Sequence, residues 1–164
     1  MSEEQKECRD NKNKPNKLVA WLMSPKDVSM YWNAVLSAVV SGLPKRMVDA
    51  DTPTNIMAAI MSGGLDCWAL LAVEQGKPPK FIGAGTTTIA EDKWLKRRSL
   101  VIYSLYSAQY VTAEAWKSAL GSVMEHAKEN GCSRVIAYTD NPRAIQLANL
   151  LGFTTGIQAI EMEV

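Results

Sequence analysis

The feature of this sequence that most constrains its fold is a row of three β-rich segments, followed by a long amphipathic helix and a further strand. The segments, residues 67–73, 80–90 and 100–106, are largely apolar or β-branched and are joined by short connections. Consecutive strands joined in this way pair antiparallel. The strand–helix–strand unit over residues 100–138 instead predicts a parallel, right-handed crossover. The sequence therefore predicts a mixed sheet flanked by helices.

Capping signals place the remaining elements. A first strand is expected over residues 17–23 and a last one over 153–164. Each predicted helix begins at a residue able to cap it: Ser24, Asp51, Thr112 and Asn141. The last two helices end at glycines, Gly131 and Gly152. The fold class is α/β (α+β), a mixed central sheet with helices, in the order β-α-α-β-β-β-α-β-α-β.

The length of 164 residues suits one domain, with 47% hydrophobic and 21% charged residues. Residues 1–16 contain no Val, Ile, Leu or aromatic residue, so we separate a polar N-terminal arm from a domain over 17–164. The formal net charge is +1, which gives no whole-protein argument for attraction to nucleic acid or to a membrane, and we do not expect nucleic acid as a partner.

Cysteine and histidine are too few and too scattered to suggest a metal site. Cys8, Cys67 and Cys132 form no CxxC pair, and His126, the one histidine, is predicted to be a surface residue. Free thiols fit a reducing compartment. No apolar run approaches the length of a membrane span, so we expect a cytoplasmic protein without membrane contact.

A basic connection over residues 93–98 surrounds Trp94. Its cations are Lys93, Lys96, Arg97 and Arg98. Such a cluster with an aromatic residue is a possible phosphate or RNA contact. Because the net charge of the chain is close to zero, we favour a solvated loop.

Several local motifs match one known family. They are Gly131-Cys132-Ser133-Arg134-Val135, Asn141-Pro142-Arg143-Ala144-Ile145, Leu150-Leu151-Gly152-Phe153, and Phe81-Ile82-Gly83-Ala84-Gly85. With the order of elements, they resemble the fold of the GCN5-related N-acetyltransferases (GNAT fold) over residues 17–164. The resemblance implies a single GNAT-like domain, and it extends to small degenerate GNAT-like proteins of tailed phages.

The resemblance implies a phosphate-binding loop that this sequence lacks. In the family a Gln/Arg-x-x-Gly-x-Gly/Ala motif opens the central helix, and its backbone amides hold the pyrophosphate of acetyl-CoA. The corresponding residues here are 111–116, Val-Thr-Ala-Glu-Ala-Trp. They contain no glycine, Val111 replaces the Gln/Arg, and Glu114 places an anion where an anion should bind.

The proton donor of the family is also missing. Many members use a Tyr four residues before the Gly of Leu-Gly-Phe, and here that residue is Ala148. Another tyrosine could act, but the sequence selects none, so we assign no catalytic residue. If acetyl-CoA binds, the resemblance implies four contacts: Tyr106, Thr112, Ala113 and Asn141.

Two functions follow from these departures. The first is a GNAT-fold protein without catalysis and without a cofactor, acting as a structural or binding module, with a phage virion or other assembly as one such role. The partner would be a protein or larger assembly contacted through residues 1–16, in the host cytoplasm or the virion. The alternative is an active acetyl-CoA-dependent N-acetyltransferase on an unknown amine.

Overall fold

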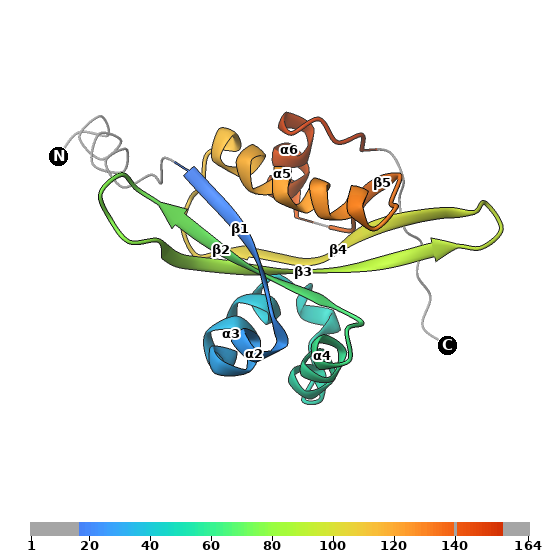
Figure 1. The fold of residues 1–164 in the computed structure, drawn as a ribbon, viewed down its shortest axis with the longest axis horizontal. Helices are drawn as coiled ribbons and strands as arrows, with labels where there is room; N and C mark the ends of the chain where they lie inside the picture. The colour runs from blue at the N-terminus through green and yellow to red at the C-terminus, as the bar shows by residue number, and fades with distance from the viewer. Residues whose placement is uncertain (1–16, 140, 156–164) are drawn as a thin grey trace.

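Over the residues that the structure describes, the chain forms a five-stranded mixed sheet with helices on both faces (Figure 1). The computed structural model describes residues 17–139 and 141–155. The strands are β1 (Lys17–Met23), β2 (Asp66–Val73), β3 (Lys80–Asp92), β4 (Arg97–Ser107) and β5 (Arg134–Ala137). The helices are α2 (Pro25–Met30), α3 (Trp32–Ser41), the short 3-10 helix η2 (Lys45–Met47), α4 (Thr52–Met61), α5 (Ala113–Glu129) and α6 (Pro142–Leu150).

The strands lie side by side in sequence order. The pairs β1–β2, β2–β3 and β3–β4 are antiparallel, whereas β4–β5 is parallel with α5 as the connection. The predicted mixed sheet and the parallel pairing of the two strands joined by α5 are therefore confirmed. Of the predicted final strand, residues 153–155 have no regular structure, and the rest lies outside the described residues, as does the predicted arm over 1–16.

Two apolar cores form, one on each face of the sheet. The first packs Val28, Val35 and Val39 of the α2–α3 region, together with Ile56 and Ile60 of α4, against the strands. The second lies under α5, as the buried residues Leu18, Trp68, Leu70, Ile82, Ala115 and Ala119 show. In Figure 1, α2, α3 and α4 cover the lower face, whereas α5 and α6 lie above the sheet.

The first predicted helix is in fact two helices. Ser24 begins α2 as expected, and its side chain and that of Asp27 form a reciprocal capping box. The backbone of Tyr31 then leaves the helical region at φ −109° and ψ 23°, so that α2 ends and α3 starts there. The uninterrupted apolar stripe hid this break because both helices bury the same side.

The start of α4 differs from the prediction in its capping residue. Asp51 makes no side-chain cap. Instead Oδ1 of Asp49 accepts hydrogen bonds from the Thr52 amide (2.8 Å) and the Thr52 hydroxyl (2.7 Å). The Thr52 hydroxyl and amide hold the pKa of the Asp49 carboxyl below its ordinary value.

The β3–β4 hairpin is longer than predicted. The basic connection shrinks to residues 93–96, because Arg97 and Arg98 belong to β4, opposite Asp92 and Glu91 of β3. Opposite charges facing each other across two strands favour this pairing. In Figure 1 the hairpin projects well beyond the helices. No helix in residues 17–139 and 141–155 is long and apolar enough to cross a membrane.

Candidate functional site

The candidate site is the place where β4 and β5 part. The two strands pair from Ser99–Arg134 to Ile102–Ala137, and β5 ends there. β4 continues to Ser107, bonded to β3 on its other edge. Within the described part of the chain, the edge of β4 from Tyr103 to Ser107 therefore has no strand beside it and keeps backbone groups available to a ligand.

A bulge in β4 marks the point of divergence. Thr87 of β3 lies opposite Ile102, but the adjacent Thr86 lies opposite Ser104, so Tyr103 is an extra residue in β4. A bulge bends its strand and increases the local twist. The strand thus turns away from its parallel neighbour at the residue where pairing with β5 stops.

The beginning of α5 lies directly after this open stretch of β4. The connection is anchored by the Ala108 amide, which donates to the Ile82 carbonyl (2.8 Å). Thr112 caps the helix, since its hydroxyl accepts from the Ala115 amide (3.3 Å). The amides of Ala113 and Glu114, in the first turn, have no carbonyl within the helix to bond. They are the backbone donors that an anion could meet here.

The side chains of this turn leave little room on the core side. Val111 and Ala115 are buried in the second core, and Trp116 packs against that core. Glu114 is exposed in the first turn. An anion approaching the free amides would thus meet a carboxylate.

The predicted cofactor contacts do not share one environment. Thr112 and Ala113 lie at the start of α5. The side chain of Tyr106 packs against the first core, on the face of the sheet opposite α5. Asn141 caps α6, and its side-chain oxygen accepts from the Arg143 amide (3.0 Å). Contacts of these four residues with a cofactor stay a prediction.

Three other tyrosines belong to the segments that form the candidate site. Tyr103 is the bulge residue, Tyr110 precedes α5, and Tyr138 directly follows β5. All three are exposed. Along the chain they stand at the open stretch of β4, before α5 and after β5, while Ala148 on α6 has no proton to give.

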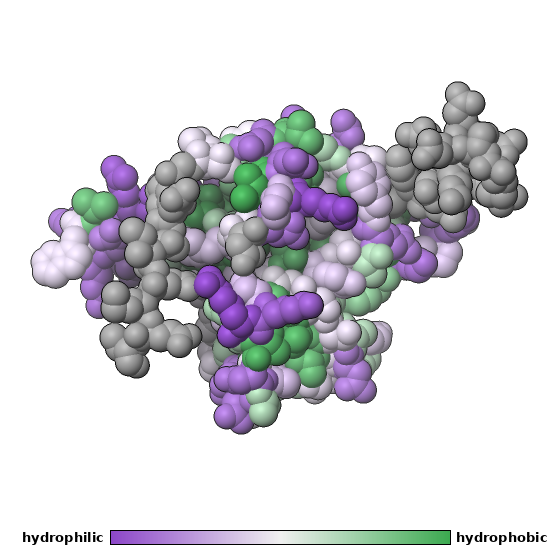
Figure 2. Space-filling view, turned by 180° about the vertical axis from the view of Figure 1, so that it is seen from behind, coloured by the Kyte–Doolittle hydropathy of each residue, from purple (hydrophilic) through white to green (hydrophobic). Residues whose placement is uncertain are grey.

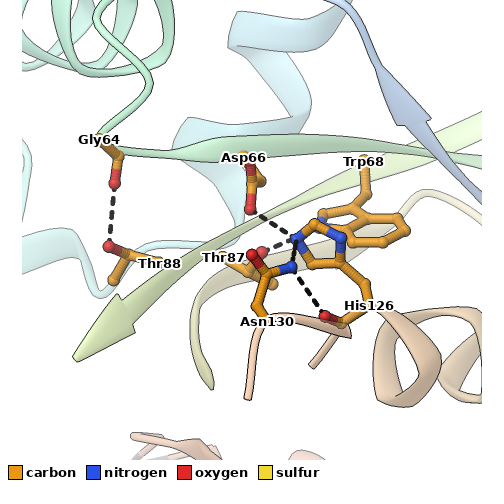
Figure 3. Close-up of polar contacts among 7 residues, drawn as sticks. All are labelled: Gly64, Asp66, Trp68, Thr87, Thr88, His126 and Asn130. Atoms are coloured by element: carbon orange, nitrogen blue, oxygen red, sulfur yellow. Dashed lines mark hydrogen bonds and ion pairs between the residues drawn. The ribbon is translucent and has the colours of Figure 1, made fainter. Parts of the chain in front are cut away.

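A second polar cluster, which the sequence did not reveal, joins α5 to the sheet (Figure 3). The His126 side chain is only 17% exposed, and its Nε2 lies 2.9 Å from Asp66 Oδ2. Its ring meets Trp68 edge-on, with ring centroids 5.3 Å apart. The Trp68 indole N–H in turn donates to Thr87 Oγ1 (3.0 Å).

The prediction of a surface histidine was wrong for this reason. Asp66 and His126 are 60 positions apart in sequence. A signal was present: Asp66 is an acid at the start of a buried strand, where a partner is needed. The pair is enclosed by Trp68 and by Asn130, whose side chain donates to the His126 carbonyl (2.9 Å). It acts as a link between α5 and β2.

Cys67 is unsuited to thiol chemistry, and the described residues form no candidate metal centre. Burial raises the pKa of the Cys67 thiol to about 11, so the thiol is protonated and inert at neutral pH. Among the residues that the structure describes, no group of three or more His, Cys, Asp or Glu side chains could hold a metal ion.

Comparison with solved structures identifies the fold. An aminoglycoside acetyltransferase from an uncultured soil metagenomic sample, in complex with sisomicin, superimposes with a TM-score of 0.65 at 14% identity, covering 91% of this chain and 96% of that chain. A predicted acetyltransferase with acetyl-CoA from Clostridium acetobutylicum gives 0.63 at 13% identity, with 89% and 96% covered. A GNAT family acetyltransferase of Staphylococcus aureus gives 0.62 at 13% identity, with 90% and 99% covered.

These likenesses show that the chain has the GNAT fold, as the sequence motifs suggested. Comparison of the sequence with protein-family models gives no match, and comparison with curated proteins gives none either. At identities this low, the likeness establishes the fold, and function has to be argued from the site.

Proposed function

We propose that this GNAT-fold protein is a non-catalytic structural or binding module whose acetyl-CoA site has degenerated. The observation that carries the proposal is the first turn of α5. It has no glycine between residues 111 and 116, its core side is filled by Val111 and Ala115, and it exposes Glu114. A carboxylate beside the free amides repels the phosphate that the family motif would bind there.

Two further features support the loss of catalysis. Ala148 stands at the position of the family tyrosine and cannot protonate a thiolate. Tyr106 packs against the first core on the other face of the sheet, so its phenol ring contributes to packing. The losses of the anion site and of the acid are independent, because they lie on α5 and α6.

The module would serve in an assembly, with a phage virion as one setting. The polar arm over residues 1–16 is the proposed contact with the partner protein. Removing it should leave the melting temperature of the domain unchanged while the chain no longer co-sediments with its assembly. Retained co-sedimentation would show that the arm is not the contact.

One observation favours the alternative, an active acetyl-CoA-dependent N-acetyltransferase. β4 still departs from β5 after Ile102, so within the described residues an open strand edge next to the start of α5 is present. A helix N-terminus attracts anions whatever its sequence. Binding of acetyl-CoA therefore has to be measured rather than inferred from the missing glycines.

The test is thermal unfolding with and without acetyl-CoA. A cofactor with a micromolar Kd, present at about 1 mM, would stabilise the fold by roughly 4 kcal/mol and raise Tm by several degrees. We expect no shift for the wild type and no release of CoA thiol over a panel of amines. A shift of several degrees together with thiol release would establish the alternative.

Two variants tell which feature prevents binding. Glu114→Gly removes the carboxylate and restores the family glycine at an exposed position. Glu125→Gln, exposed on the same helix, is the matched charge control. If Glu114 is the obstacle, only the first variant gains a Tm shift with acetyl-CoA. Equal behaviour of the two variants would move the explanation to the missing lead residue at Val111.

A further inference from the structure

The outer end of the β3–β4 hairpin is unlike the rest of the surface. β5 pairs with β4 only from Ser99 onward, so residues 91–98 project as a two-stranded ribbon (Figure 1). In Figure 2, the projecting end at the left is mainly hydrophilic, with a small hydrophobic area at its edge. This ribbon lies at the opposite end of β4 from the candidate site.

The tip of the ribbon carries two adjacent apolar side chains. Trp94 is 96% exposed and Leu95 is 61% exposed. Their backbone amides are both satisfied internally, because Asp92 Oδ1 accepts from Trp94 N (3.0 Å) and Leu95 N (2.9 Å). The tip can therefore enter a less polar medium without leaving these two donors unbonded.

Cations lie directly behind this apolar tip. Lys93, Lys96, Arg97 and Arg98 border an open hollow of about 520 Å³, together with Gly131 and Ser133 of the α5–β5 turn and the single acid Glu91. The Ser133 amide and hydroxyl both donate to the Arg98 carbonyl, at 3.0 and 3.3 Å. The hollow thus has a fixed wall lined by four cations and one carboxylate. With Asp92, which lies opposite Arg97, residues 91–98 carry four cations and two acids, a local excess of two positive charges.

We propose that this tip, Trp94-Leu95 with the four cations behind it, docks the protein on an anionic lipid bilayer surface. Tryptophan and leucine would enter the interfacial region, while lysine and arginine contact the headgroup phosphates. A bilayer suits the arrangement better than a single-stranded nucleic acid. A base can stack on Trp94 but makes no use of Leu95 or of internally bonded amides.

The expectation of no membrane contact rested on the lack of a spanning segment and on the net charge. Peripheral docking needs neither, since a local cluster of cations acts within a Debye length of the surface. The proposal goes beyond the proposed function and does not depend on it, because no residue of the ribbon belongs to the candidate site.

The experiment is co-sedimentation of the full chain with vesicles. One set contains phosphatidylcholine with about 30% phosphatidylserine, and the other contains phosphatidylcholine alone. We expect binding to the anionic vesicles only. The double variant Lys96→Gln/Arg97→Gln should weaken binding to the anionic vesicles about 30-fold, because each of the two cations contributes roughly a factor of five to six in affinity. Trp94→Ala/Leu95→Ala should weaken it about tenfold or more.

Matched controls separate the tip from general surface effects. Leu150→Ala removes another exposed apolar side chain, and Lys26→Gln/Lys117→Gln removes two exposed cations elsewhere. Both should bind anionic vesicles like the wild type, apart from a small uniform loss for the charge control. The altered residues are exposed, so unchanged melting temperatures are expected for all variants.

Two results would overturn the proposal. One is a tip variant that binds anionic vesicles as tightly as the wild type. The other is failure of the wild type to bind these vesicles while it binds a single-stranded oligonucleotide, which would assign the cations to nucleic acid instead.

Discussion

The two halves of β4 are held in different ways. The first half, Arg97–Ile102, has β3 on one edge and, from Ser99 onward, β5 on the other. The second half, Tyr103–Ser107, has only β3 within the described residues, yet glycines from two elements approach it closely. A Cβ on Gly83 would lie 2.0 Å from the Tyr106 carbonyl oxygen, and one on Gly42 would lie 2.8 Å from the Leu105 amide nitrogen.

The difference shows how an unpaired strand edge can be kept in place. Among residues 17–139 and 141–155, the second half has no strand on the side where a ligand could bind, so β3 and the end of α3 hold it from the other sides. Close approach of backbones needs glycine, because any side chain would occupy the same space. We therefore expect substitutions at these glycines to lower the free energy of unfolding more than the loss of a hydrogen bond in the first half of β4.

The largest effect is expected at Gly83. Gly83→Ala places a Cβ against the backbone of Tyr106 and Ser107, which cannot move as a side chain could. We expect a loss of about 3 kcal/mol or more in the free energy of unfolding, measured by urea denaturation. Gly64→Ala is the control, since its nearest contact would be 3.4 Å and it should change little. Similar results for the two variants would contradict the close contact.

A smaller loss is expected at Gly42, at the end of α3. Gly42→Ala would press on the Leu105 backbone from the helical layer and cost about 1–3 kcal/mol. Gly121→Ala in the middle of α5, with nothing within 4 Å of the added Cβ, should instead stabilise by up to about 1 kcal/mol. If Gly42→Ala also raised the free energy of unfolding, the end of α3 would not be a support for the second half of β4.

A buried hydroxyl pair gives the next effect. Thr86 Oγ1 and Ser104 Oγ lie 2.8 Å apart, and both residues are buried. Thr86→Val leaves the Ser104 hydroxyl without this partner and should cost about 1–2 kcal/mol. Adding Ser104→Ala should recover part of that loss in a double-mutant cycle. Strictly additive losses would argue against coupling across β3 and β4.

The smallest effect is expected in the first half of β4. Arg134 of β5 donates from Nε to the Ser99 hydroxyl at 2.8 Å. Ser99→Ala should cost only about 0.5–1 kcal/mol, because the exposed arginine can bond to water instead. A loss as large as that at Gly83 would show that the doubly paired half is the more sensitive one, and would reverse the comparison.

Much of the architecture was predictable because its signals are local. Ser24, Thr112 and Asn141 begin helices as expected, each with its side chain accepting a hydrogen bond from the first turn. The ends of α5 and α6 were also predictable from their glycines. Gly131 and Gly152 adopt positive φ values of 71° and 88°, as expected for glycines that follow a helix. Alternating and continuous apolar runs located the strands.

The predictions that failed have two causes. Capping by Asp49 and the break at Tyr31 are local features that residue spacing alone does not distinguish from their neighbours. The His126–Asp66 pair depends on residues 60 positions apart that the folded chain brings together. The same holds for the candidate site, where the placement of Tyr106 on the face opposite α5 follows from the strand register and from the bulge at Tyr103. The pattern of residue types along the chain does not by itself determine the register between strands.

By itself, the sequence determined the order of the elements, the apolar faces of the helices and strands, and the residue types at 111–116 and 148, which differ from the family motifs. These are properties of residue type and of spacing within one helix or strand. Only the tertiary structure decided where β4 leaves β5, which face Tyr106 occupies and which acid meets His126. These features arise from contacts between residues far apart in sequence, whose geometry is set when the layers pack.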